Sequence, residues 1–140
     1  MNSKKPRGNI VEYLRTAGVR PTRQRIALAK LLFHGAYRHV TADGLYKEAL
    51  RANIRVSIAT IYNTLHQFMA ANLLQEIVVD SARTYFDTNV GHHHHFFYSD
   101  LDELEDIQNG KIELVKLPEL PSGTKVDSVD VLIKISKKII

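Results

Sequence analysis

The sequence predicts an α+β protein, with helices in its first half and strands in its second. Two observations support this prediction. Apolar residues recur at helical spacing in four stretches between residues 9 and 70, and each stretch follows a residue that can cap a helix. From residue 74 onward, short runs rich in β-branched and aromatic residues take over.

The two halves also differ in charge. Residues 1–86 hold 13 Lys and Arg against 5 Asp and Glu, whereas residues 87–140 hold 6 against 10. Such asymmetry indicates a part that binds nucleic acid joined to an acidic part with another task. We therefore place a domain boundary between residues 86 and 87, and we expect the basic residues 1–7 to form a disordered tail.

Three helices are expected before residue 54, with Asn9, Thr22 and Thr41 as their N-caps. Gly18 and Gly35 are expected to end the first two. Each helix has an apolar side, and the residues expected to face inward are Ile10, Val11, Leu14, Ile26, Ala29, Leu32, Phe33, Leu45, Ala49 and Leu50.

A fourth helix, beginning after the candidate cap Ser57, has the clearest periodicity. Its packed side is expected to hold Ile58, Ile61, Leu65, Phe68 and Met69. Its opposite side is small and polar, and consists of Thr60, Asn63, Thr64 and Gln67. Such amides and hydroxyls can read base edges in the major groove, and Arg51 and Arg55 precede the helix. An ordinary solvent-facing helix is the alternative, although such helices more often carry Lys and Glu.

Two strands, residues 74–79 and 84–87, are expected to form a hairpin around residues 80–83. Helices followed by such a hairpin describe a winged helix-turn-helix. Arg83, at the tip, would lie where a wing touches phosphate. Residues 1–86 are therefore predicted to be a winged-helix DNA-binding domain.

Residues 87–140 are predicted to be a small α/β dimerisation domain. Strands are expected at residues 92–98, 104–107, 111–117 and 126–135, with a proline-containing loop at residues 117–123. About fifty residues make a small core, so a second copy of the chain is expected to complete it. A two-fold dimer is also what a winged helix needs to read two half-sites.

Four consecutive histidines, His92 to His95, run directly into Phe96 and Phe97. Imidazole is the commonest protein ligand for transition metals and a usual axial ligand for haem iron. In an extended segment His93 and His95 face one way and His92 and His94 the other, so one strand could serve two sites. A solvated polar run is the alternative interpretation.

The chain contains no cysteine, which excludes disulfides, Cys-ligated zinc and Cys-ligated haem. Any metal site must therefore use His, Asp and Glu. No apolar run approaches the roughly 20 residues that a membrane-spanning helix needs, and no apolar signal core follows the basic start. We expect a cytoplasmic protein without a membrane partner.

Four segments, in this order, resemble the ferric uptake regulator (Fur) family. They are residues 18–25 (GVRPTRQR), residues 39–46 (HVTADGLY), residues 57–65 (SIATIYNTL) and the histidine run after Tyr85-Phe86-Asp87. With four histidines and no cysteine, the chain is most similar within the family to the iron response regulators (Irr). The resemblance implies a dimeric, haem-responsive transcription regulator of iron and haem metabolism that binds an AT-rich inverted-repeat operator in double-stranded DNA.

The resemblance also implies ligands for one divalent metal ion, Fe(II), Mn(II) or Zn(II). They are His39, Asp87, His93, His95 and Asp106. A second metal site would use His92, His94 and Glu113, and haem would be bound by His93, His94 and His95. No structural zinc is expected, because Tyr98 and Leu101 stand about where many members have their first cysteine pair.

The residues expected to contact DNA are Arg20, Arg55, Ser57, Thr60, Tyr62, Asn63, Gln67 and Arg83. Tyr62 matches a DNA-contacting tyrosine of the family. Asn63 stands where many members place Arg, so the preferred target is expected to differ from that of the iron repressors.

We therefore predict a DNA-binding regulator, and not an enzyme, whose affinity is controlled by metal and haem. An iron, manganese or peroxide sensor of the same family, without haem, is the alternative. A metal-dependent enzyme would take His93, His95 and Asp106 as a facial ligand set, and a metal or haem buffering protein would need only the histidine run. Neither of these accounts for the basic first half or the polar face of the fourth helix.

Overall fold

Four helices and a three-stranded sheet form the first of two units, Met1–Val90, and the second unit is Gly91–Ile140. The structure is a computed structural model that describes residues 9–108 and 110–138, so the tail expected at residues 1–7 lies outside the described residues. The first unit extends beyond the expected boundary at residue 86. The reason is local: the last strand of its sheet runs through Asp87, and Thr88 bonds back to Arg38.

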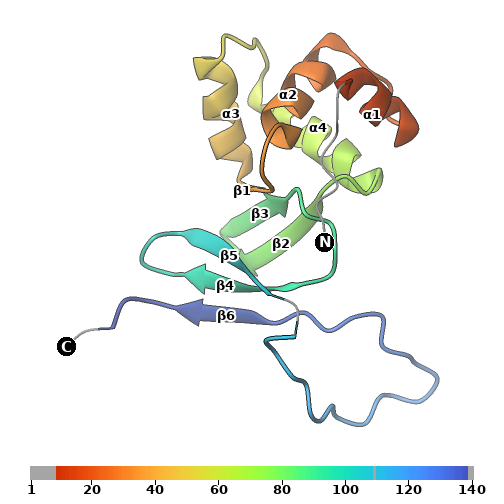
Figure 1. The fold of residues 1–140 in the computed structure, drawn as a ribbon, viewed down its shortest axis with the longest axis vertical. Helices are drawn as coiled ribbons and strands as arrows, with labels where there is room; N and C mark the ends of the chain where they lie inside the picture. Colours follow the sequence, from red (N-terminus) through yellow and green to blue (C-terminus); the bar gives the residue numbers. More distant parts are fainter. Residues whose placement is uncertain (1–8, 109, 139–140) are drawn as a thin grey trace. The chain divides into compact units, whose positions relative to one another are not determined.

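The helices are α1 (Ile10–Thr16), α2 (Arg23–Phe33), α3 (Ala42–Arg51) and α4 (Ile58–Ala70), shown in Figure 1. All four predicted caps are confirmed, because the side chains of Asn9, Thr22, Thr41 and Ser57 each accept a hydrogen bond from a first-turn N–H. Each cap satisfies a donor that the helix itself leaves unpaired. No helix among the described residues is long and apolar enough to cross a bilayer.

The four helices share one core. Its fully buried members include Leu14, Leu28, Leu32, Leu45, Ile61, Leu65 and Phe68. Two residues expected to face inward do not, since Leu50 is 52% exposed and Ile58 is 38% exposed. Thr64, assigned above to the polar face of α4, is buried instead. Helical geometry explains this correction, because position 64 lies three residues after Ile61 and four before Phe68, within the packed stripe.

The sheet of the first unit contains β1 (His39–Val40), β2 (Gln75–Asp80) and β3 (Arg83–Asp87) in the order β1-β3-β2, all antiparallel. The β2–β3 pair confirms the predicted hairpin. Strand β1 was not predicted, because two residues are too short to show a periodic pattern. Its register places His39 opposite Asp87 and Val40 opposite Phe86.

The second unit contains β4 (His94–Tyr98), β5 (Glu103–Ile107) and β6 (Leu132–Ile135) in the order β5-β4-β6. Strand β5 is antiparallel to β4, whereas β6 is parallel to it. The strand expected at residues 111–117 is wrong, and the one expected at residues 126–135 shortens to β6. Apolar residues alternate in both segments, but a strand also needs a neighbouring strand to pair with. In the second segment this pairing begins only at Leu132, which lies opposite His95 of β4.

The burial pattern of α4 predicts a contrast between two isoleucines on one helix. Ile61→Ala is expected to lower the free energy of unfolding by about 2–5 kcal/mol, because it leaves a cavity in the core. The matched control Ile58→Ala, at a partly exposed position, should change it by less than about 1 kcal/mol. Urea denaturation of both variants measures the difference, and equal losses would contradict the packing of α4.

Candidate metal centre and nucleic-acid interface

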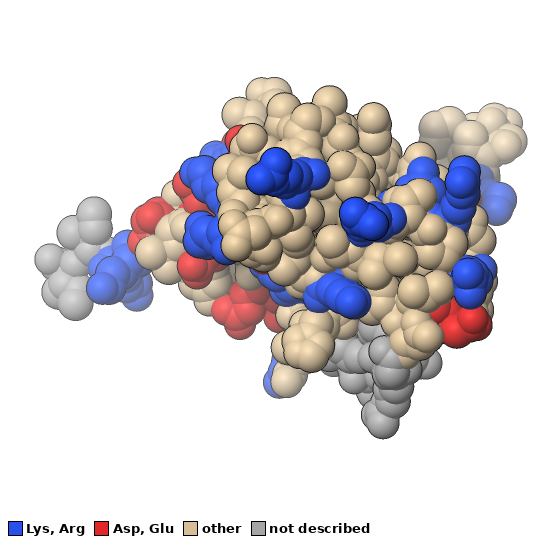
Figure 2. Space-filling model, turned by 90° about the horizontal axis from the view of Figure 1, so that it is seen from above, with Lys and Arg blue, Asp and Glu red and all other residues tan. Residues whose placement is uncertain are grey.

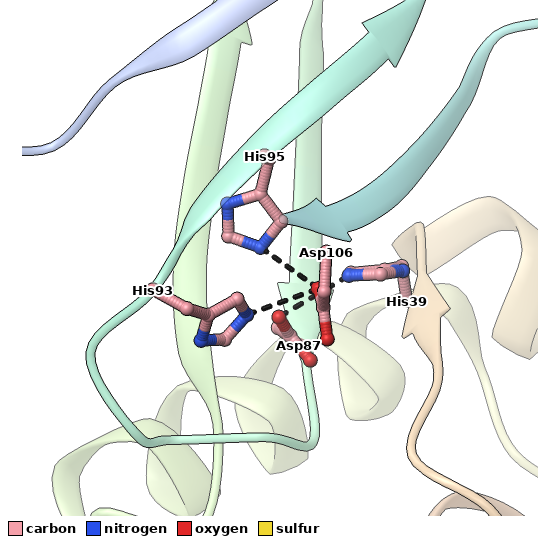
Figure 3. Close-up of side chains that lie close together, drawn as sticks. All are labelled: His39, Asp87, His93, His95 and Asp106. Carbon is pink, nitrogen blue, oxygen red and sulfur yellow. Dashed lines mark hydrogen bonds and ion pairs between the residues drawn. The ribbon is translucent and has the colours of Figure 1, made fainter. Parts of the chain in front are cut away.

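A histidine and a carboxylate face each other in the sheet of the first unit (Figure 3). His39 and Asp87 are register partners across β1 and β3, and Nε2 of His39 lies 3.2 Å from Oδ2 of Asp87. The side chain of Asp87 is 0% exposed, and its Oδ1 accepts a hydrogen bond from the backbone N–H of Asn89 (2.9 Å). A buried carboxylate needs such donors or a cation, because its desolvation is costly.

In the second unit, His95 of β4 and His93, which directly precedes β4, lie next to a carboxylate of β5 (Figure 3). The rings of His93 and His95 are 4.4 Å apart, and Asp106 pairs with His95 across the two strands. Oδ1 of Asp106 lies 3.0 Å from Nε2 of His93 and 3.2 Å from Nε2 of His95. The alternation predicted for the histidine run is confirmed on this face.

These three donors suit a transition-metal ion. Nδ1 of His93 lies 2.6 Å from the carbonyl oxygen of Gly91, and a carbonyl can only accept a hydrogen bond. Nδ1 therefore carries a proton, which leaves Nε2, the nitrogen that faces Asp106, as the one that can bind an ion when it is not itself protonated. This is the usual orientation of a metal-ligating histidine, whose second nitrogen donates to a backbone carbonyl.

His94, on the opposite face, has the reverse arrangement. Its Nδ1 accepts a hydrogen bond from the backbone N–H of Val131 (3.0 Å), so the neutral ring carries its proton on Nε2. That nitrogen then has no lone pair for a metal or for haem iron. The contact counts against the prediction of His94 as a ligand.

The second predicted metal site is not assembled among the described residues. The rings of His92 and His94 are neighbours (5.3 Å), but Glu113 does not join them in a group of metal-binding atoms. Instead, Nε2 of His92 lies 3.3 Å from the exposed carboxylate of Asp130, just before β6. Asp130 was not foreseen, because its approach depends on the parallel pairing of β6 with β4.

The polar face of α4 borders a groove that it shares with α2. The groove has a volume of about 310 Å³ and is lined by Thr22, Gln24, Arg25, Thr60, Asn63, Thr64 and Gln67. Arg20 lines an adjoining hollow with Arg25 and Gln67. Gln24 and Arg25 were not predicted as DNA contacts; only the packing of α2 beside α4 brings them to this face. Figure 2 shows Lys and Arg side chains scattered over the side of the molecule that it presents.

The other predicted DNA contacts are Tyr62 on α4, Arg55 and Ser57 just before α4, and Arg83 on the hairpin. Tyr62 is 43% exposed, and Arg55 is exposed in the loop before α4. The hydroxyl of Ser57 is occupied as the helix cap, accepting from the N–H of Thr60 (3.1 Å). Arg83 is held by Asp80, with Nη2 2.7 Å from Oδ2, and this hydrogen bond holds the pKa of Asp80 below its usual value.

A winged helix with a polar face on its fourth helix and a histidine–carboxylate cluster define a class of DNA-binding regulators. The family model described as "Ferric uptake regulator family" matches residues 16–134, so this chain belongs to that family. It is 32% identical to the ferric uptake regulation protein of Pseudomonas fluorescens over 104 residues, which cover 74% of this chain and 85% of that protein. It is 34% identical to the peroxide-responsive repressor PerR of Staphylococcus epidermidis over 105 residues, which cover 67% of this chain and 69% of that protein.

A solved structure shares the fold. The ferric uptake regulator from Pseudomonas aeruginosa, solved with manganese, superposes with a TM-score of 0.69 and 25% identity over 91% of this chain and 97% of that one. The predicted family and the predicted α+β fold are thus confirmed, and the protein is a transcription regulator and not an enzyme. The finer resemblance to the iron response regulators stays a prediction.

The two opposed histidine orientations predict different effects on metal binding. His93→Ala is expected to weaken Mn(II) binding by at least about tenfold, because it removes an oriented nitrogen ligand. His94→Ala, its neighbour on the other face of β4, should leave the affinity close to that of the parent. Isothermal titration of the metal-free proteins with Mn(II) measures both values. A larger loss in His94→Ala than in His93→Ala would contradict the tautomers assigned here.

Proposed function

We propose that this protein is a metal-responsive transcription regulator, a homodimer whose affinity for an operator in double-stranded DNA is set by Fe(II), Mn(II) or Zn(II). The observation that carries the proposal is the pair of partly buried His39 and fully buried Asp87 inside the winged-helix unit. Because this pair lies in the unit that contacts DNA, an ion bound by it can change the affinity of that unit for DNA directly. The relative from P. aeruginosa, which was solved with manganese, supports the choice of metal.

The proposed site joins the donors of both units around one ion. His39 and Asp87 come from the first unit, and His93, His95 and Asp106 come from the second. Only five residues separate Asp87 from His93, so the connection spans at most about 20 Å even when fully extended. So short a tether keeps the two donor sets at high effective concentration for each other. Three imidazoles and two carboxylates suit a divalent first-row metal.

The two donor sets suggest how metal control operates. When the five side chains hold a common ion, the winged helix and the second unit are fixed at one angle. In a dimer that angle determines the spacing of the two α4 helices. Occupancy then shifts an equilibrium between DNA-competent and incompetent arrangements, by as much as the ion prefers one over the other.

Operator recognition is assigned to α4 and the residues around its groove. Asn63 and Gln67 offer amides on the exposed face, whereas Thr60 is partly buried at the groove wall. Amides of this kind form hydrogen bonds with adenine in the major groove. Arg55, before the start of α4, and Arg20 and Arg25, which line a hollow with Gln67 near its end, can neutralise phosphates. Tyr62 extends the same exposed face. The hydrogen bonds of Arg83 to Asp80 make Arg83 a weaker phosphate contact than the sequence suggested, because Asp80 competes for the guanidinium.

The homodimer is assigned to the second unit. Its buried residues, within the described part of the chain, are His95, Phe97 and Ile107, which is a very small core. The segment between β5 and β6 exposes apolar side chains, among them Val115 (88%) and Leu117 (47%). A second copy of the unit would cover such a surface and complete the core.

Haem is the second candidate ligand, and the histidine run is its support. The three predicted ligands are engaged: His93 and His95 contact Asp106, and His94 accepts from Val131. A haem iron that used His93 or His95 would therefore have to take a ligand from the proposed metal set. Under this proposal haem opposes metal by removing a ligand, and the protein resembles the iron response regulators. Without haem binding, it is a plain metal sensor of the family.

Replacing His39 tests the shared metal site. His39→Ala leaves the second unit unchanged, yet it should lower Mn(II) affinity and abolish the increase in operator affinity that Mn(II) produces. Binding to non-specific duplex should change little, because phosphate contacts dominate it. Fluorescence anisotropy with an AT-rich inverted repeat and a scrambled duplex, across a Mn(II) titration, measures these affinities.

The matched control is His34→Ala, at an exposed histidine just after α2. Its titration curve should overlay that of the parent. Sedimentation should show dimers for all three proteins. Identical metal dependence in His39→Ala and the parent would place the metal site in the second unit alone.

Competition between ligands tests the haem candidate. Ferric haem added to metal-free protein should give a nitrogen-ligated absorption spectrum, and saturating Mn(II) should suppress it if His93 or His95 is the iron ligand. His94→Ala should leave the spectrum unchanged. A spectrum that persists in Mn(II) but disappears in His94→Ala would reverse the ligand assignment and separate haem from the metal site.

A further inference from the structure

Arg38, the residue directly before His39, connects three elements of the first unit. Its Nη1 donates to the carbonyl oxygen of Leu31 in α2 (3.1 Å) and to Oε1 of Glu48 in α3 (3.0 Å). Its Nη2 donates to the other carboxylate oxygen of Glu48. The two side chains are only 32% and 26% exposed. A half-buried bidentate pair of this kind is geometrically well defined.

The backbone of Arg38 is hydrogen-bonded to Thr88, the residue that follows strand β3. Its N–H donates to Oγ1 of Thr88 (2.9 Å), and its carbonyl oxygen accepts from the N–H of Thr88 (3.0 Å). Thr88, which is buried, directly follows Asp87. The His39–Asp87 pair is therefore flanked by the Arg38–Thr88 pair, and the guanidinium of Arg38 joins this part of the sheet to α2 and α3.

We propose that Arg38 is a positioning residue that couples metal occupancy at His39 and Asp87 to the helices that read DNA. The inference rests on the function proposed above. Strand β1 has only two residues, so few hydrogen bonds of its own hold His39 in place. A displacement of His39 on metal binding moves the adjoining Arg38. Because the guanidinium of Arg38 holds both carboxylate oxygens of Glu48, it moves Glu48 and α3 as well.

From α3 the displacement reaches α4 through close packing. Leu45 and Ala49 of α3 and Ile61 and Leu65 of α4 are fully buried members of the same core. Such a core transmits small shifts instead of absorbing them, because it has few voids. The route therefore runs from the metal ligands through Arg38 and Glu48 to the recognition helix, within a single unit.

A purely structural role makes a different prediction. If the Arg38–Glu48 pair only stabilised the fold, its loss would lower the stability of the protein and leave the ratio of operator affinities with and without metal unchanged. Coupling predicts that this ratio falls. The ratio therefore separates the two roles.

The experiment compares Arg38→Lys and Glu48→Gln with the parent. Arg38→Lys keeps the charge but loses the planar fork, and Glu48→Gln keeps the size but loses the charge. The matched control is Arg15→Lys, whose pair with Glu12 is exposed on both sides (62% and 66%). Operator affinity is measured by anisotropy without metal and at saturating Mn(II), and urea unfolding shows that each protein is folded at the assay temperature.

We expect the parent and Arg15→Lys to share one ratio, within the roughly 5- to 150-fold range of typical allosteric couplings. In Arg38→Lys and Glu48→Gln the ratio should fall toward one while metal-free affinity for scrambled duplex stays at the parent value. Reciprocity requires that operator DNA then raise Mn(II) affinity less in these variants, which titration calorimetry measures.

Unchanged ratios in both variants, in proteins that remain folded, would overturn the inference while the proposed function stands. A parent whose operator affinity ignores Mn(II) would overturn both. Exchange of the two charges in the double variant Arg38→Glu/Glu48→Arg checks the route itself. Failure of this exchange to recover any coupling beyond the Arg38→Glu single variant would count against a direct connection through the pair.

Discussion

The fully buried carboxylate of Asp87 is the constraint on which the arrangement of β1 and β3 depends. A charge without exposed surface is tolerated only with donors or a cation nearby, and here His39 and the N–H of Asn89 supply them. The hydrogen bond from Asn89 is local, but the contact with His39 requires the register of β1 against β3, so a side-chain contact supports the two-residue strand β1 in addition to its backbone hydrogen bonds. The Arg38–Thr88 pair then closes the end of this ladder.

The division of charge between the two halves of the chain also affects cation binding. The first unit is basic because it must approach phosphates, and an ion bound within it would add repulsion from its own cationic surface. The carboxylate of Asp87 offsets part of that charge within the first unit itself. A cation bound beside Asp87 therefore raises the local positive charge by less than its own charge.

Much of the fold could be predicted from the sequence, because caps and periodicity are local signals. The caps Asn9, Thr22, Thr41 and Ser57 each predict the start of a helix that the structure contains. The predictions were wrong where a strand depends on pairing with a segment that is distant in the sequence. Residues 111–117 alternate like a strand but have no partner strand, and β1 is too short to be recognised without Asp87 opposite it. The side of a helix on which a residue lies is set by helical geometry and not by residue type, which is why Thr64 is buried despite its hydroxyl.

For the proposed metal site, the residue types and the alternation of His93 and His95 could be predicted from the sequence, but the hydrogen bonds of each ring could not. Whether a histidine can ligate depends on what its other nitrogen contacts, and those contacts come from Gly91 for His93 and from Val131 for His94. Two adjacent residues of one type therefore have opposite capacities. A ring whose Nδ1 already accepts a backbone hydrogen bond, as that of His94 does, must break that bond before it can bind an ion.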